Sequence, residues 1–308
     1  MTRWPAGRSL PEPDRFPDGL DGLRARPSWR ATQDTLATLV LGAAVLVVAI
    51  PLAAVLWSVA SHGAHAAFAG FPDFFTKEIP VVSRRPGPGM GPAILGTLLV
   101  TGGATAIAVP LGVLGAIYLN EYGGSSRFAR LVRFTAMVMT GVPSIVMGLF
   151  VYLLWTTRFG YSAFGGALAL ACLMLPVVIG STEHMLRLVP NQLREGAYAL
   201  GATQARVILT VVLPAALPGI VSGALLAIAR AAGETAPLLF AVGAATAYNP
   251  HFFDEANTAL SVQIFQNAWS VFPGAQERAW GAALTLVMLT FTFTLFARLL
   301  VARRVARP

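Results

Sequence analysis

Six long runs of apolar residues, almost free of charge, constrain this chain more than any other feature of its sequence. Each run reaches the length of about 20 residues that an α-helix needs to cross the hydrocarbon core of a bilayer. The runs cover residues 36–59, 93–119, 131–155, 163–182, 217–246 and 281–300. Only 12% of the residues are charged, which is about half the share found in soluble domains. The sequence therefore predicts an all-α integral membrane protein with six transmembrane helices.

The basic residues are distributed unevenly, and their positions account for the net charge of +8. If the N-terminus is cytoplasmic and the six runs alternate in direction, sixteen of the 22 Lys and Arg residues fall on the cytoplasmic side. Five fall on the outer side. Arg and Lys favour cytoplasmic loops. We therefore predict a multi-pass protein of the bacterial plasma membrane with both termini cytoplasmic, and the charge does not indicate a nucleic-acid partner.

The apolar runs define a single six-span domain over residues 36–303, surrounded by membrane lipid. Residues 1–35 are rich in Pro, Gly, Arg and Asp and predict a flexible cytoplasmic arm. Residues 304–308 form a short basic tail. The long outer loop 247–279 contains several aromatic residues, so part of it lies either at the membrane interface or against the helix bundle. Cys172 is the sole cysteine and is expected to be a packed thiol.

The predicted cytoplasmic segment at about 190–214 has more structure than a simple loop. Pro190-Asn191 is a helix start, and the first short helix stops at Gly201. Glycine at that position allows a sharp turn where a side chain would clash. A second stretch carries aliphatic residues on one side and is expected to end at Pro214. Unpartnered loops rarely keep so many aliphatic residues, so the segment is predicted to dock into another protein.

This segment resembles the EAA loop of ABC importer permeases. The matching residues are Glu195, Ala197, Gly201, Leu213 and Pro214, with Val211 as a near match and Gly196 as a departure. The resemblance implies a type I ABC importer permease fold, in which this loop fits a groove on a separate ATP-binding subunit. The chain has no Walker A sequence, so we expect no ATPase site, no cofactor and no enzymatic activity of its own, with ATP bound by partner subunits.

Two charged residues, Arg230 and Glu234, interrupt the fifth apolar run. Each costs about 2.5–3.5 kcal/mol near the bilayer centre, which sequences rarely tolerate without a function. Four residues apart, they share a helix face and can pair. Either they are a structural ion pair, or Arg230 offers a positive station to a translocating anion while Glu234 holds the guanidinium or accepts a proton-bearing oxygen of the anion. A neighbouring row of small residues predicts close approach of another helix. The row comprises Gly219, Gly223, Ala227 and Ala231.

The stretch 229–240, Ala-Arg-Ala-Ala-Gly-Glu-Thr-Ala-Pro-Leu-Leu-Phe, resembles the PstA family of phosphate transport system permeases. The resemblance extends over residues 90–300 and includes Asn120-Glu121-Tyr122. It implies inorganic phosphate as the substrate and a pathway that includes Arg230, Glu234 and Thr235. It also implies a PstC-like permease, a PstB-like ATP-binding dimer and a PstS-like extracytoplasmic phosphate-binding protein as partners. The alternatives are a permease for molybdate or sulfate, or an ATP-independent channel or secondary transporter.

Several other residues are weaker candidates. His62 and His65 lie in a Gly/Ala-rich loop without a third ligand, so we expect no metal site there. Glu183 and His184 are interpreted as interface residues near the fourth span. Pro143-Ser144 is a candidate pathway element if the third span is broken there. None of these positions forms a catalytic constellation.

Overall fold

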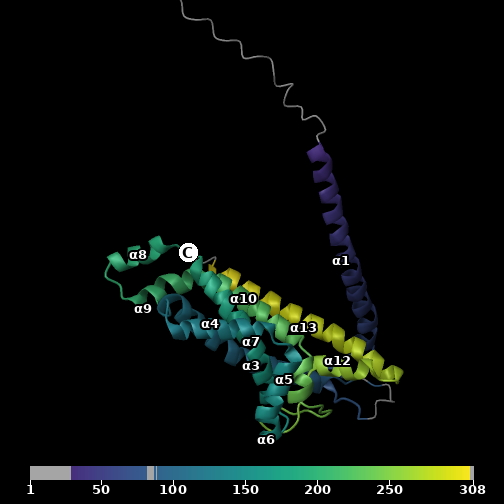
Figure 1. Cartoon of the computed structure of the whole chain (residues 1–308). Coiled ribbons are helices and arrows are strands. Elements are labelled where there is room, and N and C mark those ends of the chain that lie inside the picture. The colour runs from purple at the N-terminus through teal and green to yellow at the C-terminus, as the bar shows by residue number, and fades with distance from the viewer. Residues whose placement is uncertain (1–28, 82–86, 88, 306–308) are drawn as a thin grey trace, which may run out of the picture. The chain divides into compact units, whose positions relative to one another are not determined.

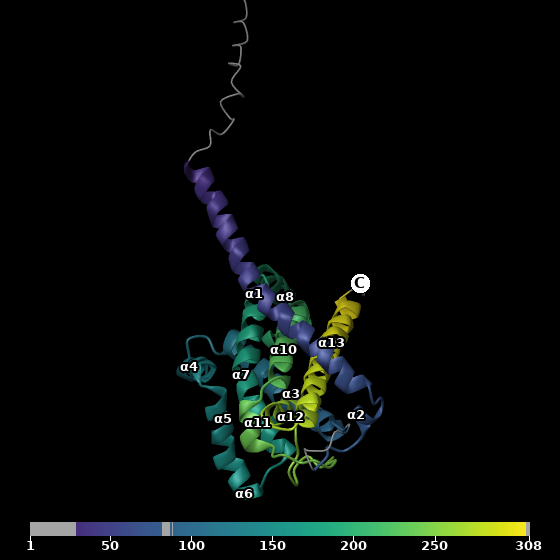
Figure 2. The same ribbon diagram turned by 90° about the vertical axis from the view of Figure 1, so that its right-hand side faces the viewer.

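The computed structural model of the chain describes residues 29–81, 87 and 89–305, and within these ranges it contains no strand (Figures 1 and 2). Its α-helices are α1 (Trp29–Phe68), α2 (Asp73–Thr76), α3 (Gly91–Ile117), α4 (Arg127–Gly141), α5 (Ser144–Val151), α6 (Thr157–Phe159), α7 (Ala163–Arg187), α8 (Asn191–Ala199), α9 (Gln204–Val207), α10 (Leu213–Ala232), α11 (Ala236–Ala241), α12 (Leu260–Ala268) and α13 (Pro273–Val305). Three π-helical turns lie at Tyr118–Tyr122, Tyr152–Thr156 and Ile208–Val212. The chain divides into two units within α1, after Leu56, and the second unit holds the candidate site.

Five helical segments of the described chain are long and apolar enough to cross a membrane. They are Gln33–Phe68, Gly91–Tyr122, Ala163–Arg187, Gln204–Ala232 and Pro273–Leu295. The bent pair of α4 with α5–α6 supplies a sixth crossing if it is counted as one span. This confirms the predicted all-α membrane fold. The orientation with both termini cytoplasmic stays a prediction.

The described part of the chain begins with a helix and ends with a helix. Residues 29–35, which we had assigned to the N-terminal arm, are the first residues of α1. Residues 1–28 of that arm lie outside the described part of the chain. At the other end, α13 continues to Val305, so the first two residues of the predicted basic tail are helical. In the first unit, residues 33–56 are mostly apolar, as suits a helix that crosses a membrane.

The third span is not the straight helix that we expected over 131–155. It bends by 109° where α4 ends at Gly141 and α5 begins at Ser144 (Figure 2). Val142 adopts an extended conformation with ψ at 127°. The residue before a proline is disfavoured in the helical region, so Pro143 forces the break. The carbonyl oxygen of Pro143 accepts from the Val146 N–H at 3.0 Å, and the role of Pro143-Ser144 as a pathway element stays a prediction.

The fifth span also departs from the continuous helix expected over 217–246. It begins earlier, at Gln204, and its main part α10 ends at Ala232. Gly233 caps that end, and the short helix α11 restarts at Ala236 with Pro237 in its first turn. Proline is favoured at the first positions of a helix because its missing N–H has no intrahelical partner there. The second half of the expected span is therefore a separate short helix followed by irregular chain.

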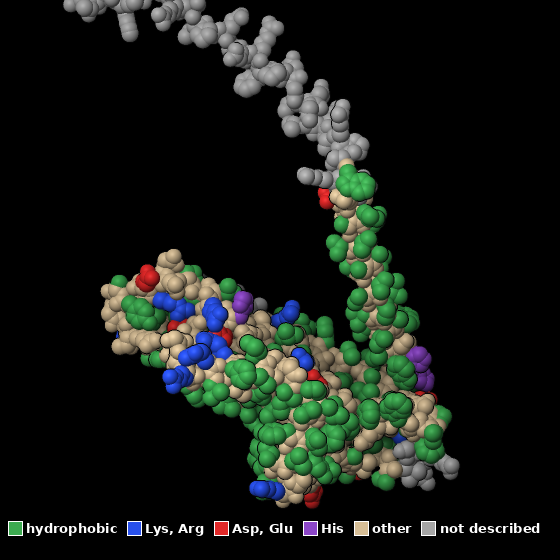
Figure 3. Space-filling view, in the orientation of Figure 1, with side chains coloured by type: hydrophobic (Ala, Val, Ile, Leu, Met, Phe, Trp, Pro, Cys, Tyr) green, Lys and Arg blue, Asp and Glu red, His purple; other side chains and the backbone are tan. Residues whose placement is uncertain are grey.

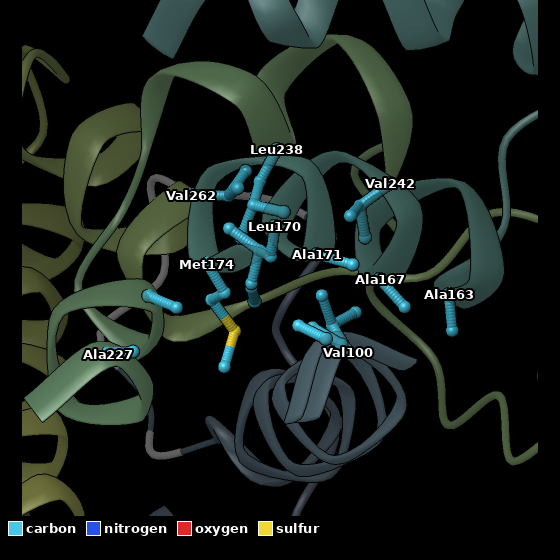
Figure 4. Close-up of a cluster of buried hydrophobic side chains, with 14 of the residues drawn as sticks. Val100, Ala163, Ala167, Leu170, Ala171, Met174, Ala227, Leu238, Val242 and Val262 are labelled. Atoms are coloured by element: carbon cyan, nitrogen blue, oxygen red, sulfur yellow. The ribbon is translucent and has the colours of Figure 1, made fainter. Parts of the chain in front are cut away.

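Small residues form the central core, where α3, α7, α10, α11 and α12 meet (Figure 4). Val100 of α3, Leu170 and Met174 of α7, and Leu238 of α11 are almost completely buried there. The predicted row of small residues on α10 packs against α7. A Cβ added at Gly223 would lie 2.6 Å from Ser181 Cβ, so the two helices approach more closely than any larger side chain allows. The prediction that this row admits another helix is confirmed.

The long loop 247–279 contains the helix α12, which packs on the helix bundle. Leu260 and Val262 are fully buried, and the Leu260 N–H donates to Thr97 Oγ1 of α3 at 2.8 Å. Trp269 lies at the other end of α12 and is exposed. Of the two alternatives left open for this loop, packing against the bundle holds for α12. The last span begins at Pro273, earlier than the expected residue 281.

Candidate functional site

The break in the fifth span places Arg230 and Glu234 together. Arg230 lies in the last turn of α10, and Glu234 lies in the irregular segment that separates α10 from α11. Arg230 Nε is 3.5 Å from Glu234 Oε1. The Arg230 side chain is 72% exposed and the Glu234 side chain 20% exposed. The predicted pairing is therefore present, although the helix ends between the two residues.

The pair borders a shallow pocket whose other walls come from α7 and α10. Leu173, Met174 and Val177 of α7 line it opposite Ala227 and Ala231. The apolar walls leave the carboxylate and the guanidinium as its polar groups. Among the described residues, the Arg230 side chain has no hydrogen-bond or ion-pair partner other than Glu234. Its two terminal nitrogens are free to donate to an anion.

Two residues fix the backbone around the break. Ser261 Oγ of α12 donates to the carbonyl oxygen of Glu234 at 3.0 Å, and Ser261 is buried. Thr235 is half-buried, and its carbonyl oxygen accepts from the N–H groups of Leu238 and Leu239 at the start of α11. The structure thus brings all three predicted pathway residues to one place. The contribution of Ser261 was missed, because nothing in the sequence indicates which loop residue returns to the fifth span.

The predicted docking segment forms two short helices around a glycine turn. The helix α8 begins at Asn191 directly after Pro190, as expected, and Gly201 has a φ of +80°. A Cβ at Gly201 would meet nothing within 4 Å, so the expected clash is wrong. Glycine is favoured there because the backbone has a left-handed conformation.

The second helix of this segment does not end at Pro214, as we had predicted. It continues from α9 through the π-helical turn Ile208–Val212 into α10. Pro214 is the second residue of α10, so its absent N–H falls close after this turn, where the hydrogen-bond pattern has already changed, and the helix is not broken. The second helix of the docking segment and the fifth span are consequently one continuous helical rod from Gln204 to Ala232.

The residues of the EAA-like pattern divide between exposed and packed positions. Glu195 and Pro214 are exposed, as is the turn at Gly201. Ala197 and Leu213 are half-buried against an apolar cluster. The large apolar side chains exposed in this region are Leu193, Tyr198, Leu200 and Leu209, of which the first three lie on α8 and the turn after it. An apolar surface with a carboxylate beside it is suited to contact another protein.

A mostly buried ion pair, which the sequence did not predict, connects this segment to the extension of α3. Both oxygens of Glu121 accept from Arg194 Nη1 at 2.6 Å. The side chains are 7% and 15% exposed respectively. Opposite charges in two segments predicted to lie on the same side of the membrane were the available signal. Arg side chains gather over α4 and α8 (Figure 3).

A second charged cluster joins α4 to α7. Glu183 Oε1 accepts from Arg133 Nε at 3.0 Å and also from Arg187 Nη2. Arg133 Nη2 in addition donates to the carbonyl oxygen of Leu119 at 2.8 Å. Glu183 therefore holds the bent third span against the fourth. His62, considered as a metal ligand, instead stacks on Trp280 with ring centroids 5.1 Å apart.

Comparison with known proteins gives a consistent family assignment. The family model described as "Binding-protein-dependent transport system inner membrane component" matches residues 108–306. The chain is 42% identical over 274 residues to the phosphate transport system permease protein PstA 1 of Mycobacterium tuberculosis strain H37Rv, covering 88% of each. It is 37% identical over 290 residues to PstA of Yersinia pestis, covering 92% of this chain and 95% of the relative.

Solved structures share the fold at low sequence identity. The MetNI methionine ABC transporter in an inward-facing conformation matches with a TM-score of 0.55 and 19% identity, over 70% of this chain and 94% of that one. A bacterial ABC transporter that imports the acidic polysaccharide alginate matches with a TM-score of 0.57 and 18% identity, over 90% of this chain and all of that one. The chain therefore belongs to the binding-protein-dependent transport system inner membrane component family, as a multi-pass membrane permease with the fold of type I ABC importers.

Proposed function

We propose that this chain is the permease subunit of an ATP-driven importer of inorganic phosphate. Its identity of 37–42% to PstA relatives over most of its length supports the substrate. The observation that carries the proposal is the exposed guanidinium of Arg230 at a break in a membrane span. A charge at that depth is rare outside substrate and ion pathways.

Arg230, Glu234 and Thr235 form the proposed station for the anion. The planar fork of Arg230 donates two parallel hydrogen bonds to a tetrahedral oxyanion. Hydrogen phosphate still carries a proton at neutral pH, and a carboxylate such as Glu234 accepts a hydrogen bond from it. Sulfate has no such proton and would face Glu234 with like charge. The arrangement thus favours phosphate over other oxyanions, provided that Glu234 contacts the anion as well as Arg230.

Its partners follow from the proposed role. A PstC-like permease would complete the pathway, and a PstS-like protein would deliver phosphate from outside the membrane. The chain has no phosphate-binding loop, so ATP hydrolysis is assigned to a PstB-like dimer. The segment about 190–214 is proposed to dock into that dimer through Leu193, Tyr198 and Leu200, with Glu195 as a charged contact.

Uptake by the complete complex tests the proposal. The chain is reconstituted in liposomes with its permease partner, the ATP-binding subunits and the binding protein, and uptake of radiolabelled phosphate is measured with and without ATP. We expect ATP-dependent uptake that excess unlabelled phosphate abolishes and that sulfate or molybdate barely reduces. Stronger competition by sulfate or molybdate than by phosphate would instead assign the complex to one of those oxyanions.

A further inference from the structure

The ion pair between Glu121 and Arg194 lies where four helical segments meet. Glu121 belongs to the π-helical turn Tyr118–Tyr122, which extends α3. Arg194 is the fourth residue of α8. Arg194 Nη2 also donates to the carbonyl oxygen of Leu186, in the last turn of α7, at 2.9 Å. Gln204, the first residue of α9, donates through Nε2 to the Glu121 carbonyl oxygen at 2.7 Å.

Helix α8 has few other attachments to the membrane body. None of its described residues is buried. Among the described residues, Arg194 is the only member of α8 whose side chain hydrogen-bonds or ion-pairs with another helix. Ala197 adds a half-buried apolar contact. A force applied to α8 therefore reaches the rest of the chain mainly through one guanidinium and through the covalent connections at the two ends of the helix.

Glu121 and the helix α3 that it extends are held firmly in the fold. Asn120 Nδ2 donates to Glu121 Oε1 at 2.7 Å, so the carboxylate is held from a second side. The helix α3 then runs into the central core, where Val100, Ala104 and Ala108 are completely buried against α7. Both oxygens of the carboxylate accept from the same guanidinium nitrogen at 2.6 Å, and such a charge-assisted contact is stronger where it is mostly buried than exposed ion pairs are.

We propose that the Glu121–Arg194 pair is the link that carries movement of α8 into α3 and so couples ATP hydrolysis to transport. This rests on the proposed function, because α8 is taken to be the part that the ATP-binding subunit moves. Arg194 and Glu121 are positioning residues: neither contacts ATP or the anion. The pair acts in parallel with the continuous rod of α9 and α10, which carries the same movement into the fifth span.

The test separates a link from a packing contact by comparing single and double variants in the assembled complex. Glu121→Gln or Arg194→Met alone leaves a buried charge without its partner, which destabilises the fold. The double variant Glu121→Gln/Arg194→Met removes both charges and is expected to restore assembly, because the introduced amide can still accept from Asn120. Arg127→Met, at an exposed arginine without a described partner at the start of α4, is the matched control.

Three quantities are measured for each assembled complex: uptake of inorganic phosphate, ATP hydrolysis, and the stimulation of hydrolysis by the phosphate-loaded binding protein. For the double variant we expect phosphate uptake per ATP hydrolysed to fall by about 5- to 150-fold. This is the range of effects that typical coupling free energies between two sites produce. Stimulation by the binding protein should be lost, while binding of the ATP-binding subunit persists. The control should match the unmodified complex in all three.

Wild-type uptake per ATP in an assembled double variant would overturn the proposal and leave the pair a packing contact. If the double variant does not assemble, Glu121→Asp keeps the charge and shortens the reach, and it must then show the same loss of uptake per ATP. Failure of the proposed function can be distinguished from failure of the proposed link. An unmodified complex that imports another oxyanion refutes the substrate, and the same comparison is then made with that anion.

Discussion

The exposed guanidinium of Arg230 is held by a neighbour that is itself half-buried. Glu234 restrains one edge of the fork through Nε, at 3.5 Å, and leaves the two terminal nitrogens available. Because Glu234 contacts the Arg230 guanidinium only through Nε, it orients the guanidinium for an anion and does not neutralise it as a tight bidentate pair would. The two residues therefore make different contributions, and single substitutions should separate them.

Substitution of Arg230 by Gln should abolish phosphate uptake and leave the complex assembled. Glutamine keeps some hydrogen-bonding capacity, but it removes the charge that attracts the anion. We expect uptake to fall more than about tenfold, the change that follows from a charged hydrogen bond of about 1.5–3 kcal/mol. Arg158→Gln, at an exposed arginine in α6, is the control. Loss of the complex on native gels would favour a structural ion pair instead.

Substitution of Glu234 by Gln should change selectivity as well as rate. A neutral amide no longer repels a fully deprotonated oxyanion, so sulfate should compete better with phosphate in the variant than in the unmodified complex. Competition curves at constant phosphate concentration measure the shift. Reduced uptake with an unchanged sulfate curve would mean that Glu234 only positions Arg230.

At the scale of elements, the glycine turn between α8 and α9 depends on backbone conformation and not on space. Gly201 has a φ of +80°, and its missing side chain would meet nothing within 4 Å. The left-handed conformation costs an ordinary residue about 1–2 kcal/mol, whereas Asn tolerates it. We predict that Gly201→Val weakens co-purification with the ATP-binding subunit and that Gly201→Asn largely preserves it. Equal losses in both variants would point to direct contact of this turn with the partner.

The contact between α7 and α10 makes a second prediction about elements. Gly223→Ala places a methyl group against Ser181 and should destabilise the chain by about 1–3 kcal/mol, the range for overpacked sites. Gly180→Ala, on α7, meets nothing within 4 Å and should be neutral or stabilising by up to about 1 kcal/mol. Thermal unfolding of the protein purified in detergent measures both. A stable Gly223→Ala variant would show that the two helices can separate at little cost.

The elements that the sequence predicted best are those whose position depends on neighbouring residues in the chain. Hydropathy located all six apolar segments, and Pro190 correctly marked the start of α8. The bend at Pro143 was considered, but a hydropathy window treats a proline-broken helix and a straight one alike. Pro214 failed as a stop signal because a π-helical turn precedes it. Hydrogen-bond patterns of that kind are set by neighbouring helices and leave little trace in composition.

At the scale of the whole molecule, contacts between distant segments were the least predictable. Glu121 and Arg194 are separated by 73 residues, and Ser261 lies 27 residues beyond Glu234. The Arg230–Glu234 pair was predictable because the two residues are only about one helical turn apart. Pairing across the fold depends on the relative placement of α3, α8 and α12, which no sequence pattern specifies.

A whole-molecule prediction concerns energy coupling. The chain alone, reconstituted in liposomes, should move no phosphate. Its family depends on a binding protein for transport, and the segment proposed to bind the ATP-binding subunits then has no partner. The measurement is efflux of radiolabelled phosphate down a concentration gradient, with protein-free liposomes as the control. Flux through the chain alone would favour the ATP-independent channel or secondary transporter.

The interruption of the fifth span has a consequence for release of the anion. Arg230 lies at the end of α10, which packs on α7, whereas Thr235 leads into α11, which packs on α5 at Gly148. The two sides of the proposed anion site thus belong to two different helices, although both helices also contact the central core. Any rotation of one against the other changes the spacing of the groups that surround the anion, and affinity changes with it. The same site can then bind the anion in one arrangement of the two helices and release it in the other, so that no second binding site is needed.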